Sequence, residues 1–210
     1  MMALQIEKNK LLLVEGKDEL SVFAEILNAI GRDDIQLIEC GGNIQLKTKF
    51  PALIKSPGFF NVTSYAIVQD ADNNAASALD RVQSLLRRCD QPVPTTSETY
   101  VDRDGLRVGI YILPGAGVTG MLEDLYLTTI AGTAVLECVD RFVADLLERC
   151  PPVVGRGQFA VPGATAKVRA LGTLMATAGP HNRLGLAAKD GYWDVTHAAM
   201  VPLTSFIRDL

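Results

Sequence analysis

Residue types that build several kinds of site are scarce in this sequence of 210 residues. Its two histidines, His181 and His197, form no HxH or HxxxH spacing, so a histidine-ligated metal is not expected. Its four cysteines include no CxxC pair, which indicates buried thiols rather than a disulfide framework or a zinc site. The cysteines are Cys40, Cys89, Cys138 and Cys150.

Long apolar runs are also missing. No stretch reaches the roughly 18 consecutive apolar residues that a membrane span requires. The start of the chain carries too many charges around too short an apolar run for a secretory signal. With 48% hydrophobic and 21% charged residues, the chain resembles neither a disordered protein nor a coiled coil. We therefore expect a soluble, cytoplasmic protein with a single domain over residues 1–210.

An excess of positive charge is absent as well. Lys and Arg number 20 and Asp and Glu 24, so the net charge of −4 argues against binding of nucleic acid by bulk charge. Residues 1–150 carry 14 basic and 21 acidic side chains (14 − 21 = −7), whereas residues 151–210 carry six basic and three acidic ones (6 − 3 = +3). An acidic body with a basic tail suits a metal-dependent enzyme for an anionic substrate, but ordinary variation of surface charge explains the counts equally well.

Short apolar runs alternate with segments of helical periodicity along the chain. Strands are expected at 11–14, 35–39 and 65–68, and as a hairpin at 99–102 and 106–113. Helices are expected at 18–30, 44–54, 75–88, 120–129, 134–149 and 165–176. This alternation predicts an α/β sandwich, with a mostly parallel central sheet flanked by helices on both faces.

Acidic residues follow two of the predicted strands. Glu15 ends the first strand and Glu19 lies one helical turn further on, so their carboxylates are expected to face the same point. Asp70 and Asp72 follow the third strand, and ligands of open α/β sheets bind at such strand ends. Each pair alone is equally well explained by a solvated turn or a helix cap. Together, however, crowded carboxylates repel unless they are protonated or bridged by a cation, and oxygen ligands suit Mg²⁺ or Mn²⁺.

These segments, LLLVEGKDE and YAIVQDAD, resemble the acidic motifs of the Toprim domain, the α/β module of topoisomerases, primases and several nucleases. The motif glutamate falls on Glu15, and the DxD falls on Asp70 and Asp72. With Glu19 and Glu123 added, the pattern is similar to the Toprim domains of OLD-family nucleases, and especially to stand-alone OLD-like Toprim proteins. The resemblance covers about residues 10–125, followed by a helical C-terminal extension at about 126–210.

The resemblance implies a Mg²⁺- or Mn²⁺-dependent nuclease that cleaves DNA or RNA. The implied metal ligands are Glu15, Glu19, Asp70, Asp72 and Glu123. The implied catalytic residues are Glu15, Asp70, Asp72 and Lys167. Lys167 takes the place of a lysine that serves OLD-like active sites, although a solvated lysine on a helix is the simpler interpretation.

Other interpretations stay open. Because the sequence has no ATPase portion, one alternative is a non-catalytic Toprim-fold module that binds a nucleotide or nucleic acid and works with a separate ATPase partner. A second is a phosphatase or nucleotide-handling enzyme that uses the same metals. The glycine-rich loop at 115–120 does not follow a first strand, so no dinucleotide cofactor is expected. Trp193 is expected to pack rather than stack on a base. Leu203, Phe206 and Ile207 suit a homodimer contact or, more simply, the core.

Overall fold

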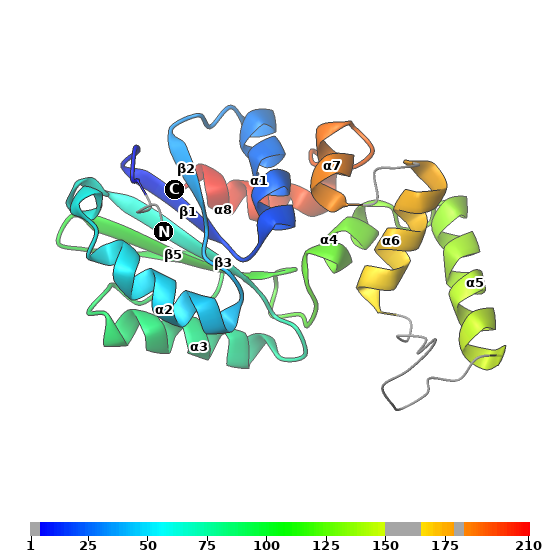
Figure 1. Cartoon of the computed structure of the whole chain (residues 1–210), viewed down its shortest axis with the longest axis horizontal. Helices are drawn as coiled ribbons and strands as arrows, with labels where there is room; N and C mark the ends of the chain where they lie inside the picture. Colours follow the sequence, from blue (N-terminus) through cyan, green and yellow to red (C-terminus); the bar gives the residue numbers. More distant parts are fainter. Residues whose placement is uncertain (1–4, 150–164, 179–182) are drawn as a thin grey trace.

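The apolar runs of the sequence form one five-stranded sheet in the computed structural model of the chain (Figure 1). The structure describes residues 5–149, 165–178 and 183–210. The strand order is β2-β1-β3-β5-β4, and every neighbouring pair is parallel except β4 and β5, which form the expected hairpin. The strands are β1 (Lys10–Val14), β2 (Ile35–Glu39), β3 (Ser64–Asp70), β4 (Thr99–Arg103) and β5 (Leu106–Leu113).

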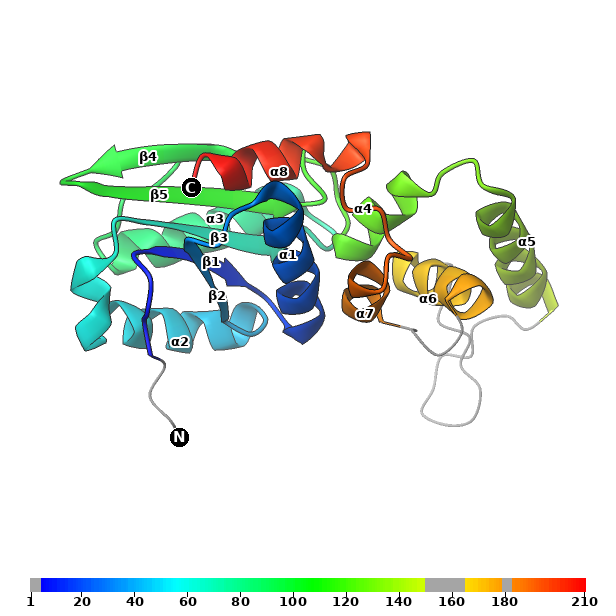
Figure 2. The same ribbon diagram turned by 90° about the horizontal axis from the view of Figure 1, so that it is seen from above.

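Helices cover both faces of the sheet, which confirms the predicted α/β architecture. Helices α1 and α8 pack on one face, and α2 and α3 pack on the other (Figures 1 and 2). The helices are α1 (Lys17–Ile30), α2 (Asn43–Ile54), α3 (Ala75–Arg88), α4 (Leu122–Thr129), α5 (Ala134–Arg149), α6 (Ala166–Thr177), α7 (Leu184–Lys189) and α8 (Val201–Arg208). Two 3₁₀ turns, η1 (Pro57–Asn61) and η2 (Ala198–Met200), complete the described elements.

The continuous apolar run of β1 reflects burial on both faces. Leu12 and Val14 belong to the core beneath α1 and α8, whereas Leu11 and Leu13 belong to the core beneath α2 and α3. A central parallel strand that is covered on both sides needs apolar residues at every position. The interior position of β1, between β2 and β3, places the residues that follow it beside the ends of both neighbouring strands.

The chain ends in helix α8, which sequence periodicity did not predict. Leu203, Phe206 and Ile207 are 0%, 4% and 0% exposed, and the ring of Phe206 stacks on Tyr100 with centroids 4.5 Å apart. These residues therefore belong to the core, as the simpler interpretation held, and they are not available for a homodimer contact. The hydroxyl of Ser64 also donates to the carbonyl oxygen of Leu210 over 3.0 Å, which ties the end of the chain to β3.

Trp193 and the cysteines test two further expectations. Trp193 is buried and meets the ring of Tyr126 edge-on, so its predicted packing role is confirmed. Cys40 is a buried thiol as expected, but Cys89 is half-buried and Cys138 is exposed, so the prediction of buried thiols is wrong for Cys138. Helical geometry turns this residue of α5 outward. Cys150 lies outside the described residues.

Helices α4 to α7 lie to one side of the sheet (Figure 2). Helix α7 returns from them to pack directly on α1. A Cβ atom at Gly185 would clash with the Cβ atom of Ser21 and would lie 3.2 Å from the carbonyl oxygen of Asp18. The absence of a side chain at Gly185 therefore permits this close approach. Throughout the described chain, none of the helices combines the length and the apolar composition of a membrane span.

Candidate active site

The carboxyl ends of three parallel strands meet at one edge of the sheet. Strand β1 lies between β2 and β3, and the backbone N–H of Cys40, just after β2, donates to the carbonyl oxygen of Val14 over 2.8 Å. Glu15 is the first residue after β1, and Asp70 is the last residue of β3. The topology therefore brings the two predicted acidic motifs to neighbouring strand ends.

Asp70 lies at the centre of the acidic residues. Burial, together with the negative charges of the other four predicted metal ligands, raises the pKa of its carboxyl group to about 8. These neighbours are Glu15, Glu19, Glu123 and Asp72. The backbone N–H of Leu122 donates to Asp70 Oδ1 over 3.2 Å. In the metal-free protein, Asp70 therefore keeps its proton at neutral pH.

Glu15 and Glu19 sit where glycines leave room for their side chains. A Cβ atom at Gly42 would lie 3.0 Å from Glu15 Oε1, and one at Gly16 would lie 2.7 Å from Glu19 Oε2. Burial raises the pKa of both carboxyl groups, and each is raised further by a neighbouring carboxylate. For Glu15, the backbone N–H of Asp70 acts in the opposite direction and lowers the pKa. The structure thus places both glutamates toward the acidic cluster.

Asp72, just after β3, pairs with the glycine-rich loop that connects β5 to helix α4. Asp72 has a φ of 51°, and its backbone exchanges two hydrogen bonds of 2.8 Å with Gly120. This bridge places the first turn of α4, with Glu123, beside the end of β3. Asp72 is exposed, whereas Asp70 is largely buried, so the two aspartates of the DxD motif differ in environment.

Lys167 reaches the same edge of the molecule from α6. Its Nζ atom lies 3.7 Å from Glu123 Oε1, and its side chain is 76% exposed. The lysine therefore contacts one predicted metal ligand, yet it remains largely in solvent. Both interpretations of Lys167 agree with this position.

Arg81 of helix α3 is a cation near the site that sequence analysis missed. Its positive charge lowers the pKa of Glu15, and its Nε atom is buried without a hydrogen-bond partner among the described residues. A signal was available, since Arg81 interrupts the otherwise apolar stripe of Ala78, Val82 and Leu85.

A polar cavity of about 330 Å³ opens beside the carboxylates. It lies where α1, α4, α6 and α7 meet, and a smaller one of about 220 Å³ adjoins it. The larger cavity is lined by Lys17, Asp18, Glu19, Leu122, Glu123, Lys167, Arg183 and Leu184. Sequence analysis predicted three of these residues as functional, namely Glu19, Glu123 and Lys167.

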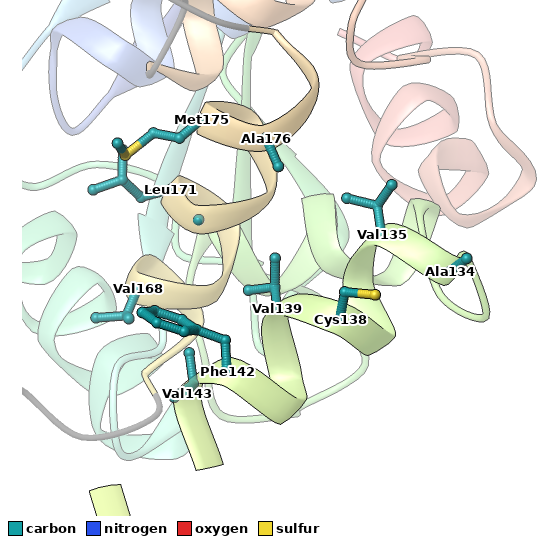
Figure 3. Close-up of a pocket in the computed structure, with 11 residues that line it drawn as sticks. Ala134, Val135, Cys138, Val139, Phe142, Val143, Val168, Leu171, Met175 and Ala176 are labelled. Atoms are coloured by element: carbon teal, nitrogen blue, oxygen red, sulfur yellow. The ribbon is translucent and has the colours of Figure 1, made fainter. Parts of the chain in front are cut away.

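A larger cavity, of about 800 Å³, lies between α5 and α6 and is apolar (Figure 3). Phe142 and Val139 of α5 point toward α6 in this groove, and the other residues that line it are apolar apart from the thiol of Cys138. None of the predicted site residues lines it. Because its lining offers no charged group, the chemistry of the molecule is better sought at the carboxylates.

The donor set at the sheet edge fits a hard divalent cation in kind. All five predicted ligands are carboxylates, which Mg²⁺ and Mn²⁺ prefer. The raised pKa of Asp70 means that the cluster retains a proton where a cation would otherwise neutralise it. In the described part of the chain, however, no three His, Cys, Asp or Glu side chains are spaced to hold an ion. Binding would therefore draw the carboxylates closer together.

Residues 9–210 match the model of a family described as "Protein of unknown function (DUF3226)". No curated protein matches the sequence. Among solved structures, the chain is similar to the C-terminal region of the Xanthomonas campestris pv. campestris OLD protein, with 16% identity, coverage of 96% of this chain and 95% of that chain, and a TM-score of 0.47. It is also similar to the C-terminal region of the Burkholderia pseudomallei OLD protein, with 15% identity, coverage of 97% and 98%, and a TM-score of 0.47.

Proposed function

The chain belongs to the DUF3226 family, whose function is unknown, and we propose from its own residues that it is a metal-dependent, Toprim/OLD-like nuclease that hydrolyses DNA or RNA phosphodiesters. One observation carries the proposal: four carboxylates, those of Glu15, Glu19, Asp72 and Glu123, gather around the half-buried Asp70 at the carboxyl ends of β1 and β3. Crowding of like charges in a half-buried site is unfavourable unless a cation or a proton compensates it. Such a cost is expected where function requires the charges.

Glu15, Asp70 and Asp72 would hold a Mg²⁺ or Mn²⁺ ion, with Glu19 and Glu123 assisting or completing a second site. An ion held there would supply activation of a water molecule and neutralisation of the charge that develops on the phosphate. Asp70 must release its proton for ligation, because its pKa is raised to about 8.

Two side chains have further roles in the proposed reaction. Glu15 has a raised pKa and lies half-buried, so it suits a general acid or base that exchanges a proton with the reacting oxygen. Lys167 carries its charge on a solvent-exposed arm beside Glu123, from which it can reach an approaching phosphate.

The test is calorimetric titration of Mn²⁺ and Mg²⁺, with plasmid DNA and a structured RNA incubated in parallel. We expect wild type to bind metal and to cleave one of the two substrates. Asp70→Asn and Glu15→Gln should abolish both properties, whereas Asp80→Asn, an exposed change on α3, should preserve them. Undiminished cleavage by both Asp70→Asn and Glu15→Gln would refute the assignment.

The alternative is a module that binds metal and a nucleotide or nucleic-acid end without turnover and works with a separate ATPase partner. It is favoured by the acidic balance of the sequence, whose net charge of −4 provides no general attraction for a long nucleic acid. Metal binding that Asp70→Asn removes, with neither plasmid nor RNA cleaved by wild type, would support this alternative.

A further inference from the structure

Three cations from distant parts of the chain line the polar cavity beside the carboxylates. Lys17 opens α1, Lys167 lies in α6, and Arg183 directly precedes α7. Lys167 is engaged with Glu123, but Lys17 and Arg183 have no ion-pair partner among the residues that the structure describes. Two positive side chains at the cavity are therefore free to bind an anion.

The backbone of Arg183 is held firmly although its side chain is exposed. Its carbonyl oxygen accepts a 2.9 Å hydrogen bond from the N–H of Ala187, and the next residue, Leu184, is buried. Two residues further on, Gly185 fits against Ser21 of α1. The packing around Arg183 thus fixes the position of its backbone, and its exposed side chain lines the cavity. Figure 1 shows α7 lying beside α1 in this position.

The chemistry of these groups fits a phosphate. A guanidinium presents parallel N–H donors that match two phosphate oxygens, and such charge-assisted hydrogen bonds are stronger than neutral ones. A volume of about 330 Å³ accommodates a phosphate with part of its sugar. The cavity also shares Glu19 and Glu123 with the candidate active site, so a strand lying over the carboxylates continues into it.

We propose that this cavity binds a non-scissile phosphate of the nucleic-acid strand that lies over the carboxylates, and that Arg183 is the main ligand of this phosphate, with Lys17 in support. The inference rests on the proposed function in one respect, namely that the bound phosphate belongs to the substrate strand. It assigns the positive charge of the C-terminal segment to a specific site. Arg183 thereby sets the position of the strand rather than taking part in the reaction.

The experiment is an NMR titration of the metal-free protein, in EDTA and low salt, with thymidine 5′-monophosphate and separately with thymidine. We expect wild type to bind the nucleotide and not the nucleoside. Arg183→Gln should weaken binding of the nucleotide about tenfold or more, as the loss of a charge-assisted hydrogen bond does. Lys189→Gln removes the same charge from the exposed end of α7, outside the cavity, and should bind like wild type.

Failure of this inference is distinguishable from failure of the proposed function, because the titration needs neither metal nor cleavage. Equal binding by Arg183→Gln and wild type, or no binding by wild type, overturns the phosphate site even if the protein cleaves DNA. Arg183-dependent binding with no cleavage of plasmid or RNA supports the phosphate site and overturns only the proposed hydrolysis. Circular dichroism melting of each variant verifies that the exposed substitutions leave the fold intact.

Discussion

At the scale of single residues, the proton on Asp70 sets the charge of the carboxylate cluster. The folded protein holds this proton up to a pH of about 8, whereas an unfolded aspartate releases it near its ordinary pKa of 3.8. A group whose pKa is raised in the folded state contributes less and less to the stability of the fold as the pH rises between those two values. The metal-free protein therefore loses stability between about pH 4 and pH 8.

Asp70→Asn should remove this loss. The amide keeps an oxygen that accepts from the N–H of Leu122, but it carries no charge. The free energy of unfolding of the variant at pH 8 should therefore exceed that of wild type by about 2 kcal/mol or more, since a difference of one in pKa corresponds to about 1.4 kcal/mol. At pH 4 the variant and wild type should have nearly equal stability. Urea unfolding in EDTA across this range measures the difference, with Asp80→Asn as the control. Stability curves of Asp70→Asn and wild type that run parallel would contradict the prediction.

At the scale of elements, the turn after β2 positions Glu15. Gly42 has a backbone conformation open to alanine, but a Cβ atom would lie 3.0 Å from Glu15 Oε1. Gly42→Ala should therefore displace the carboxylate and weaken Mn²⁺ binding about tenfold, as changes behind a metal ligand do. Calorimetry compares it with Ile44→Ala, a substitution of an exposed side chain in the same segment. Unchanged Mn²⁺ affinity of Gly42→Ala would show that the Glu15 side chain accommodates the added Cβ atom without being displaced.

The contact between α7 and α1 is the second element-scale test. Because a Cβ atom at Gly185 would clash with Ser21, Gly185→Ala should destabilise the protein by about 1–3 kcal/mol, the usual cost of overpacking. Leu186→Ala alters the exposed side of the same helix and should cost much less. Urea unfolding followed by circular dichroism measures both variants. Similar losses of stability in Gly185→Ala and Leu186→Ala would mean that the fold does not require the close approach of α7 to α1.

The sequence predicts best those elements whose hydrophobic periodicity lies within their own residues. The run at 11–14 and the helix at 75–88 carry their periodicity in their own residues, so their positions were predicted closely. Helix α7 is six residues long and contains Gly185, a poor helix former, so its packing on α1 determines it. Helix α8 had a usable signal in Pro202, which favours the first turn of a helix.

The candidate site was predictable to a similar degree. Glu15 and Asp70 follow recognisable strands, and parallel strand ends meet at one edge, so their proximity followed from the sequence. The positions of Arg81 and Arg183 did not follow, because each reaches the site through packing between elements. Only the tertiary fold brings those cations to the carboxylates.

At the scale of the whole molecule, the acidic body and the basic C-terminal segment meet at the polar cavity. The three cations that line this cavity offer contacts to a single strand, whereas the net charge of −4 provides no general attraction. Binding of single-stranded DNA in EDTA should therefore fall with salt with a log–log slope of about −2. Fluorescence anisotropy at several NaCl concentrations measures it. A slope several times steeper would indicate a larger basic surface elsewhere on the protein.

The burial of Trp193 has a practical consequence. It is the only tryptophan of the chain, it is 2% exposed, and its ring centroid lies 5.4 Å from that of Tyr126 in α4. Selective excitation of this indole reports on one place, the junction between the sheet and the helical segment that carries Arg183. Because the indole is buried, we expect its emission to be blue-shifted while the junction stays closed and to move to the red when water enters. The molecule thus contains its own optical probe for the docking of its C-terminal segment.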